Sequence, residues 1–411
     1  MQQGFFKLPT APAPVRGLPR GGVLGCGHTC TLHRGCLSPK MTVTGQGRME
    51  ILVYAEAPGA DEDEQNTQLI GESGQLLREV LGDCGFDLDR DCRKTNAVRC
   101  RPPENRKPTA LEIATCQPHF WAEVAAHPPK VILLLGQVAV ESFLWGRFKQ
   151  APGSIGRWRG FAIPDQRAQA WVCPTFHPAY ILRSRTGRAI RGKAEPVQSV
   201  EERTFRADVA SALTLLRVPF PVAPVPKVVT VTARQSDEIT HVLRSLHRVS
   251  PLAIDYETTG LRPWSRPDHH IISAGVCWGS TTMAFPMEAG VEEWKCLLAD
   301  PQVRKVAHNM KFEHQWAAHC LGTETQGWVW DSMIAAHMVD NRKNICGLKH
   351  QAYLNFGVEN WGDDIEFDGD ADFNATGHAE ADADLLHYNA LDAYWCLRLF
   401  HHQRKQFKQS P

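Results

Sequence analysis

The sequence has no long apolar run, no excess of charge of either sign and no leader-like start. None of its hydrophobic stretches is long enough to cross a bilayer, so no membrane-spanning segment is expected. Prolines follow the first eight residues directly and leave no room for the apolar core of a signal peptide, which predicts a cytoplasmic protein. Because 45 basic residues balance 45 acidic ones, any binding of nucleic acid must come from local basic patches.

The chain also lacks repeats and has little biased sequence. The main biased stretch is residues 217–226, which hold four prolines in ten residues and favour an extended, semi-rigid linker. At 411 residues the chain is too long for one ordinary core, so two domains of roughly 200 residues are expected, at residues 26–216 and 227–411. The Pro- and Gly-rich residues 1–25 are predicted to form a flexible tail.

Strand and helix patterns alternate before the linker and restart beyond it. In the first domain, strands are expected at residues 49–54, 94–98, 130–136 and 170–175, and helices at 73–81, 108–127 and 137–145. Alternation of this kind predicts an α/β fold, a parallel sheet covered by helices on both faces. In the second domain, strands are expected at residues 228–232, 251–256, 271–279 and 281–286, and helices at 236–246, 311–320, 331–339 and 381–406.

Acidic side chains in the second domain lie where a nuclease metal site would need them. Asp255 and Glu257 end an apolar strand, and the two-residue period of a strand places both carboxylates on one side. Tyr388 and Asp392 lie four residues apart on a predicted helix and share one face, while Glu313 lies near the start of another helix. Two Mg²⁺ or Mn²⁺ ions about 4 Å apart can activate a water for phosphodiester cleavage, and such hard cations prefer carboxylate oxygens. Asp255, Glu257 and Asp392 are therefore the predicted metal ligands, and Tyr388 is predicted to orient the attacking water.

These acidic segments, in order and spacing, resemble the exonuclease motifs of the DnaQ-like superfamily, above all those of the proofreading domain of family A DNA polymerases. Residues 329–333, Val-Trp-Asp-Ser-Met, resemble the Asp-Thr-Met helix start of that family. The resemblance covers residues 227–411 and implies an RNase H-like mixed sheet with helices and metal-dependent 3′–5′ exonuclease activity. Glu313 stands where the family carries aspartate, so weakened or retuned activity is expected rather than loss. The alternative is that these acids are ordinary surface charges or helix caps.

Four short motifs in the first domain lie at the ends of predicted strands or at the start of a helix. They contain Glu56, Leu69, Asn96 and His177. Because the carboxyl ends of parallel strands meet at one edge of a sheet, motifs placed there gather in one crevice, where α/β folds bind ligands.

These motifs resemble those of the fourth, iron–sulfur-containing family of uracil-DNA glycosylases, over residues 26–216. The resemblance implies a three-layer αβα fold with a four-stranded parallel sheet, acting on a base flipped out of the DNA stack. It implies Glu56 near the water and the sugar, Asn96 paired with the uracil edge, and His177 stabilising charge on uracil O2 as the glycosidic bond breaks. Leu69 stands where the family stacks phenylalanine on the base. Since base stacking is worth about 1–3 kcal/mol, uracil is expected to be held less well, or the substrate to differ.

Thirteen cysteines are present, and a disulfide framework is not expected because cytosolic thiols stay reduced. The resemblance implies a [4Fe–4S] cluster held by four of them. Cys100 and Cys116, with 15 residues between them, match the family's second ligand pair, and Cys30 matches an upstream ligand. Either Cys26 or Cys36 would complete the set. Zinc is the alternative metal for four cysteines, and buried thiols without metal are the alternative to both.

A basic strip follows His177. Arg183, Arg185 and Arg188 lie in a stretch without acidic residues until Glu195, which suits contact with backbone phosphates. A solvated loop is the alternative interpretation. These arginines and Leu69 are the predicted DNA contacts.

The leading hypothesis is a two-domain DNA replication and repair enzyme with 3′–5′ exonuclease activity and uracil excision, similar to module fusions encoded by bacteriophages. Its expected partners are single-stranded or frayed 3′ ends and uracil-containing DNA, in the host cytoplasm for a phage protein. Because the sequence ends soon after the third acidic motif, the exonuclease is expected to act alone or to serve a separate DNA polymerase. The competing hypothesis is a non-catalytic glycosylase-like module that directs the nuclease to DNA. Leu69 favours this hypothesis, whereas Asn96 and His177 favour catalysis.

Overall fold

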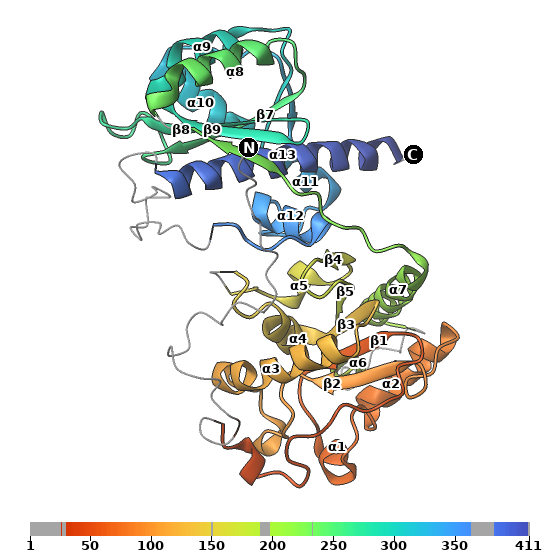
Figure 1. Cartoon of the computed structure of the whole chain (residues 1–411). Coiled ribbons are helices and arrows are strands. Elements are labelled where there is room, and N and C mark those ends of the chain that lie inside the picture. The colour runs from red at the N-terminus through yellow and green to blue at the C-terminus, as the bar shows by residue number, and fades with distance from the viewer. Residues whose placement is uncertain are drawn as a thin grey trace. The chain divides into compact units, whose positions relative to one another are not determined.

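A computed structural model describes residue 26 and residues 30–148, 151–189, 198–231, 233–362 and 382–409. The predicted tail, residues 1–25, lies outside the described residues. The chain divides into two compact units, residues 1–220 and 221–411 (Figure 1). Each unit has its own sheet and its own hydrophobic core, so each is described by itself.

The N-terminal unit is built on a five-stranded sheet with the order β2-β1-β3-β5-β4. β2, β1, β3 and β5 run parallel, which confirms the predicted parallel sheet. β4 adds an antiparallel edge beside β5, and its three residues are too few to show a strand period in the sequence. The strands are β1 (Ile51–Ala55), β2 (Cys92–Asn96), β3 (Val131–Leu135), β4 (Ile163–Asp165) and β5 (Ala170–Thr175).

Helices cover both faces of this sheet and complete the predicted three layers. On one face, Leu77 of α2, Ile181 of α6 and Val209 of α7 share a core with Val53 of β1. On the other face, Phe120 of α3 packs on Tyr54 with ring centroids 4.2 Å apart. Val53 and Tyr54 are neighbours, and so they project to opposite sides of the strand. The helices are α1 (Ala60–Gln65), α2 (Glu72–Asp83), α3 (Ala110–Ala126), α4 (Gly136–Phe143), α5 (Ile155–Trp158), α6 (Pro178–Ala189) and α7 (Val200–Thr214).

The C-terminal unit is built on a six-stranded mixed sheet with the order β11-β10-β7-β8-β9-β6. The central pairs β7–β8 and β8–β9 are antiparallel, whereas β10 runs parallel to both β7 and β11, and β6 runs parallel to β9. This is the mixed sheet with helices that the RNase H-like interpretation predicted. The strands are β6 (Lys227–Thr230), β7 (Leu252–Thr258), β8 (Ile271–Trp278), β9 (Thr281–Pro286), β10 (Lys305–Ala307) and β11 (Trp328–Asp331).

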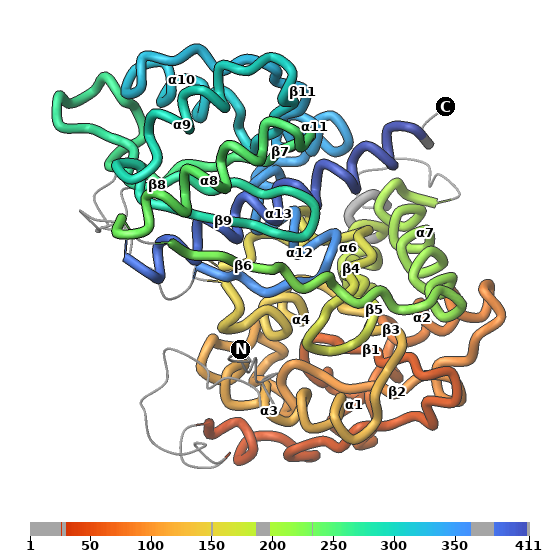
Figure 2. The backbone as a smooth tube through the Cα atoms, turned by 45° about the horizontal axis from the view of Figure 1, so that its top comes forward, coloured from red at the N-terminus to blue at the C-terminus, as the bar shows by residue number. Residues whose placement is uncertain are grey.

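Two groups of helices enclose this second sheet. Leu243 of α8, Trp294 of α9 and Trp316 of α10 pack on one face, against Ile254 of β7. The long helix α13 lies along the opposite face together with α11 and α12 (Figure 2). Among the described residues, none of the helices combines the length and the apolar character that crossing a bilayer requires. The helices are α8 (Ser236–Leu246), α9 (Met287–Ala299), α10 (Met310–Leu321), α11 (Ser332–Val339), α12 (Leu348–Phe356) and α13 (Ala383–Gln409).

Candidate active sites

The C-terminal unit brings its three predicted metal ligands together. Asp255 and Glu257 project from the same side of β7, and Asp392 projects toward them from α13, which packs across β7 and β8. One carboxylate oxygen from each of the three lies within 4.8 Å of the others. The predicted convergence of acids more than 130 residues apart is therefore confirmed.

A fourth carboxylate, that of Glu313 on α10, faces the same cluster. Glu313 is 2% exposed, and its Oε2 has no hydrogen-bond partner among the described residues. Burial raises its pKa, and the charges of Asp255 and Glu257 raise it further. Burial likewise raises the pKa values of Asp255 and Glu257, with the charge of Asp392 adding to both. So many buried carboxylates repel one another unless a cation lies between them, so the donor set fits hard divalent ions.

Two residues that the sequence interpretation missed complete the surroundings of Asp392. The Lys349 ammonium group of α12 donates to the Tyr388 hydroxyl at 2.5 Å and lies 3.3 Å from Asp392 Oδ2. The Trp361 indole N–H donates to Asp392 Oδ1 at 2.5 Å. Helix α12 was not predicted, and neither residue belongs to a recognisable spacing, so the sequence carried no signal for them.

Asp331, in the segment that resembles the Asp-Thr-Met helix start, holds two helix starts together. Its carboxylate accepts hydrogen bonds from the backbone N–H groups of Met333 and Ile334 in the first turn of α11. It also accepts from those of Asn309 and Met310, at the start of α10. Since α10 carries Glu313, Asp331 fixes the helix from which this fourth carboxylate projects.

In the N-terminal unit, Glu56, Asn96 and His177 lie at the carboxyl ends of β1, β2 and β5. Asn96 is the last residue of β2 and pairs in register with Ala55, directly before Glu56. The pairing continues past the strand, because the Val98 N–H donates to the Glu56 carbonyl at 3.1 Å. Because these strands run parallel in one sheet, their carboxyl ends lie at the same edge, and the three residues lie there; their gathering in one crevice with Leu69 stays a prediction.

His177 is held as a neutral imidazole in one tautomer. Burial lowers its pKa to about 4, and the nearby Arg183 charge contributes. The Ala179 N–H donates to Nδ1 at 3.2 Å, so the proton of the neutral ring lies on Nε2. At Gly136 the backbone has φ of +85°, and an added Cβ would lie 2.8 Å from the His177 Cβ. This position therefore requires glycine.

The predicted basic strip lies on helix α6 rather than on a loop. Arg183 is exposed, and its charge lowers the pKa values of both Glu56 and His177, so it lies near both residues. Burial has the larger effect on Glu56 and raises its pKa. Arg185 instead pairs with Glu202 of α7, with 2.6 Å between Nη2 and Oε1. The side chain of Arg188 lies outside the described residues.

Leu69 is part of the hydrophobic core. It is 6% exposed, packs with the residues of α2, α6 and β1, and has φ of +54°. An added Cβ at Gly74 would lie 1.9 Å from the Leu69 carbonyl oxygen, so Gly74 is required for this close approach. The contacts of Leu69 among the described residues are thus core contacts, and its predicted role at a flipped base stays a prediction.

The predicted cluster ligands form one electrostatic group. Cys30, Cys100 and Cys116 are buried, whereas Cys26 and Cys36 are partly exposed. Burial raises the pKa of Cys100 to about 11 and that of Cys116 to about 12. The charge of Cys26 raises the pKa values of Cys30, Cys100 and Cys116, whereas Cys36 acts on Cys100. Thiols are the donors that a tetrathiolate metal group requires, but among the described residues only the three carboxylates of the C-terminal unit already lie close enough together to hold an ion.

These arrangements define a protein with two hydrolase-type sites, one in a three-layer α/β unit and one in an RNase H-like unit. Residues 43–201 match the uracil DNA glycosylase superfamily, and residues 230–408 match a 3′–5′ exonuclease family. The type-4 uracil-DNA glycosylase of Thermotoga maritima is 35% identical over 174 residues, which are 42% of this chain and 86% of that protein. The chain therefore belongs to the type-4 uracil-DNA glycosylase family through its N-terminal unit, and its C-terminal unit is similar to 3′–5′ exonuclease domains over residues 230–408.

A second relative aligns with both units. The DNA polymerase of Bacillus phage SP01 is 22% identical over 377 residues, which are 87% of this chain and 39% of that protein. The chain thus spans less than half the length of this relative. Among solved structures, Escherichia coli RNase D aligns with 45% of this chain and 46% of its own, with 14% identity and a TM-score of 0.35.

Proposed function

We propose that this protein degrades DNA from 3′ ends with two bound divalent ions and excises uracil from DNA. The observation that carries the first activity is the convergence of Asp255, Glu257 and Asp392 within 4.8 Å. These three residues would hold Mg²⁺ or Mn²⁺, and Glu313 would hold a further ion or its water. The bound ions would supply the activation of water and the stabilisation of the leaving 3′ oxygen.

The remaining residues of this site orient the reactants. The Tyr388 hydroxyl accepts a hydrogen bond from the Lys349 ammonium group and interacts with the Asp392 carboxylate, which places it beside the proposed ions to orient the attacking water. The Trp361 N–H fixes the carboxylate of Asp392 in one rotamer through a hydrogen bond to Oδ1. The proposed substrate is a single-stranded or frayed 3′ end, because the attacked phosphodiester has to reach a partly buried cluster.

A labelled single strand tests this activity directly. With Mg²⁺, wild-type protein should shorten a 5′-labelled oligonucleotide from its 3′ end. Asp255→Ala should stop the shortening, whereas Asp384→Ala, which removes an exposed acid from the first turn of the same α13, should not. Equal activity of wild type and Asp255→Ala would overturn the proposed metal site.

For uracil excision, the proposed roles rest on the placement of Glu56, Asn96 and His177 at the carboxyl ends of parallel strands. Asn96 pairs with the uracil edge, and the neutral His177 donates from Nε2 to uracil O2 as negative charge develops there. Glu56 lies one residue past β1 and positions the water that attacks the sugar. A uracil-containing strand incubated in EDTA, which silences the nuclease, should break at uracil after alkali. Asn96→Ala and His177→Ala should prevent the break.

We further propose that Cys26, Cys30, Cys100 and Cys116 hold the [4Fe–4S] cluster. Cys26 interacts with all three buried thiols, and Cys36, whose thiol forms a hydrogen bond with Cys100, is the alternative fourth ligand. Cys26→Ser should lower the iron content and the visible absorbance of the purified protein, and Cys36→Ser should preserve both. A zinc-containing, colourless wild type would contradict this assignment.

The core position of Leu69 favours a second candidate function. Without an aromatic side chain stacked on the flipped base, the N-terminal unit would bind DNA without breaking the glycosidic bond of uracil. It would then direct the exonuclease to the bound DNA. The partner in either case is proposed to be a DNA polymerase, since the relative that aligns with both units is one. Strand breakage at uracil in the EDTA assay would exclude this second candidate.

A further inference from the structure

Helix α1 carries a carboxylate that binds two separate loops of the crevice. The Glu62 Oε2 accepts the N–H of Gly59, in the loop that follows Glu56, at 3.1 Å. Its Oε1 accepts the N–H groups of Ile70 and Gly71, directly after Leu69, at 3.1 and 3.0 Å. One side chain therefore bridges the loop that bears Glu56 and the loop that bears Leu69.

The approach of this carboxylate to the backbone is close. An added Cβ at Gly59 would lie 2.6 Å from Glu62 Oε2, and an added Cβ at Gly71 would lie 3.1 Å from Asp61 Oδ2. Both loops thus have glycine where the carboxylates of α1 approach them. The three N–H donors also explain why residue 62 is a glutamate. A glutamine side chain would turn its NH₂ group, which cannot accept a hydrogen bond, toward one of the two loops.

The next residue on α1 binds the cysteine-rich segment. Asp63 is 2% exposed, and its carboxylate accepts the N–H groups of Leu37 and Ser38 at 3.1 and 2.8 Å. The Ser38 hydroxyl donates to the Asp63 carbonyl at 2.6 Å. These two residues directly follow Cys36, and two residues later the Lys40 N–H donates to the Cys100 sulfur at 3.2 Å.

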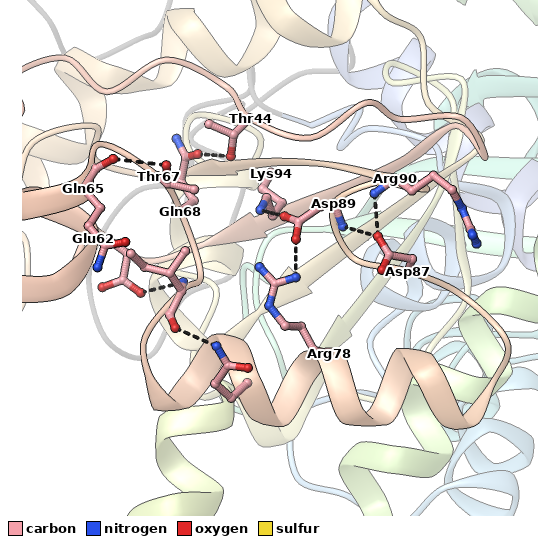
Figure 3. Close-up of polar contacts among 12 residues, drawn as sticks. Thr44, Glu62, Gln65, Thr67, Gln68, Arg78, Asp87, Asp89, Arg90 and Lys94 are labelled. Carbon is pink, nitrogen blue, oxygen red and sulfur yellow. Dashed lines mark hydrogen bonds and ion pairs between the residues drawn. The ribbon is translucent and has the colours of Figure 1, made fainter.

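A second tie runs between the same parts of the unit. Gln68, which precedes Leu69, is 1% exposed, and its amide group donates to the Thr42 carbonyl at 2.5 Å. Its carbonyl oxygen accepts from the Thr44 hydroxyl (Figure 3). The segment that follows the cysteines is therefore bonded both to α1 and to the Leu69 loop.

We propose that α1 links the cysteine-rich segment to the uracil crevice, with Asp63 holding residues 37–38 and Glu62 holding the two crevice loops. Glu62 is then a positioning residue, because it acts through the loops of Glu56 and Leu69 and not on the substrate. The link has a consequence for the metal group: loss of order in the cysteine-rich segment loosens the crevice, although no cysteine belongs to it. This inference rests on the proposed uracil excision for its catalytic readout.

The first test compares Glu62→Gln with Glu64→Gln, a matched change at an exposed position of the same helix. Deuterium exchange by mass spectrometry should be about tenfold faster in peptides that contain Gly59 and Ile70–Gly71 of Glu62→Gln, and unchanged in Glu64→Gln. Single-turnover excision should slow roughly 10- to 100-fold in Glu62→Gln, with little change in the affinity for uracil-containing DNA. Glu62→Asp, which keeps the charge, should show the intermediate effect.

The second test concerns the link to the cysteines. Asp63→Asn should speed exchange at Leu37 and Ser38 and should make iron easier to remove with chelator. In the wild-type protein, removal of iron should speed exchange at Gly59 and Ile70–Gly71 as well, and should leave exchange in the C-terminal unit unchanged.

The exchange data separate this inference from the proposed function. If wild-type protein does not excise uracil but Glu62→Gln still speeds exchange in both loops, the link stands and excision is wrong. If Glu62→Gln and Glu64→Gln show the same exchange in both loops, the link is overturned whatever the activity. If Glu62→Gln does not fold, Glu62→Asp takes its place in the test. Unchanged deuterium exchange in both loops of Glu62→Asp would likewise overturn the link.

Discussion

At the residue scale, the acidic side chains that would bind the metal ions destabilise the folded protein when no metal is bound. Burial raises the pKa values of Asp255, Glu257 and Glu313, so the folded metal-free protein holds more protons than the unfolded chain. The contribution of these three carboxyls to stability is therefore greatest below the unfolded carboxyl pKa of about 4 and falls as the pH rises through the raised folded values. In EDTA at neutral pH, Asp255→Asn should raise the melting temperature, by about 2–4 °C for each kcal/mol gained, and should abolish exonuclease activity. Asp384→Asn is the control, and a lowered melting temperature for Asp255→Asn would contradict the argument.

Lys349 places a cation of the protein itself beside a proposed metal ligand. Its ammonium group lies 3.3 Å from Asp392 Oδ2 and bonds to Tyr388 at 2.5 Å. Lys349→Met should therefore tighten Mn²⁺ binding, because the ion no longer competes with the ammonium group, and yet slow 3′ degradation roughly tenfold or more, because Tyr388 loses its fixed orientation. Titration of free Mn²⁺ by electron paramagnetic resonance gives the affinity. Lys295→Met on α9 is the matched control, and weaker Mn²⁺ binding in Lys349→Met would argue against this competition.

Arg183 tests the electrostatics of the uracil crevice. Its charge lowers the pKa values of both Glu56 and His177. Arg183→Met should therefore move the acid limb of the excision rate to higher pH, since both groups take up a proton more readily. The measurement is the pH profile of single-turnover excision, with Arg203→Met on α7 as the control. If the acid limb of the excision rate moves to lower pH or does not move, protonation of Glu56 and His177 does not control it.

At the scale of elements, the turn between β3 and α4 packs against His177, which lies about 40 residues further along the chain. Gly136 has φ of +85° and leaves no space for a Cβ beside His177. Gly136→Ala should cost about 1–2 kcal/mol of stability from the left-handed backbone alone and should slow excision roughly 10- to 100-fold. Gly82→Ala in α2, where an added Cβ meets nothing within 4 Å, should instead stabilise by about 0.5–1 kcal/mol. Urea unfolding and the EDTA excision assay measure the two effects.

The bounds of some strands and helices could be predicted from the sequence. The strands 170–175 and 281–286 and the helix 236–246 have the predicted bounds, because each shows a clear apolar pattern between turn residues. Helix α9 was missed because it begins at Met287, directly after β9, without an intervening loop. β4 and β10 are three residues long and too short for a period to appear.

For the two sites, the sequence predicted residues that share a pattern within one element, but it did not predict contacts between side chains of different elements. The convergence of Asp255, Glu257 and Asp392 followed from a strand period and from motif order. Lys349 and Trp361 reach Asp392 from segments with no local pattern that points to it. The bonds of Glu62 to two loops likewise depend on the path of the backbone, which no spacing in the sequence reveals.

At the scale of the whole molecule, two units with separate cores should respond separately to the metal groups proposed for them. A ligand that binds one folded unit stabilises that unit by mass action and leaves an independent unit unchanged. Calorimetry of the full chain should therefore show two transitions, one raised by Mn²⁺ and the other lowered by removal of iron. Asp255→Ala should abolish the Mn²⁺ shift without moving the iron-dependent transition, and Cys116→Ser should do the reverse. The boundary between the two compact units falls at residues 220–221, inside the proline-rich segment. A single transition moved by both metals would show that the two units unfold as one, and the activities would then be expected to depend on each other.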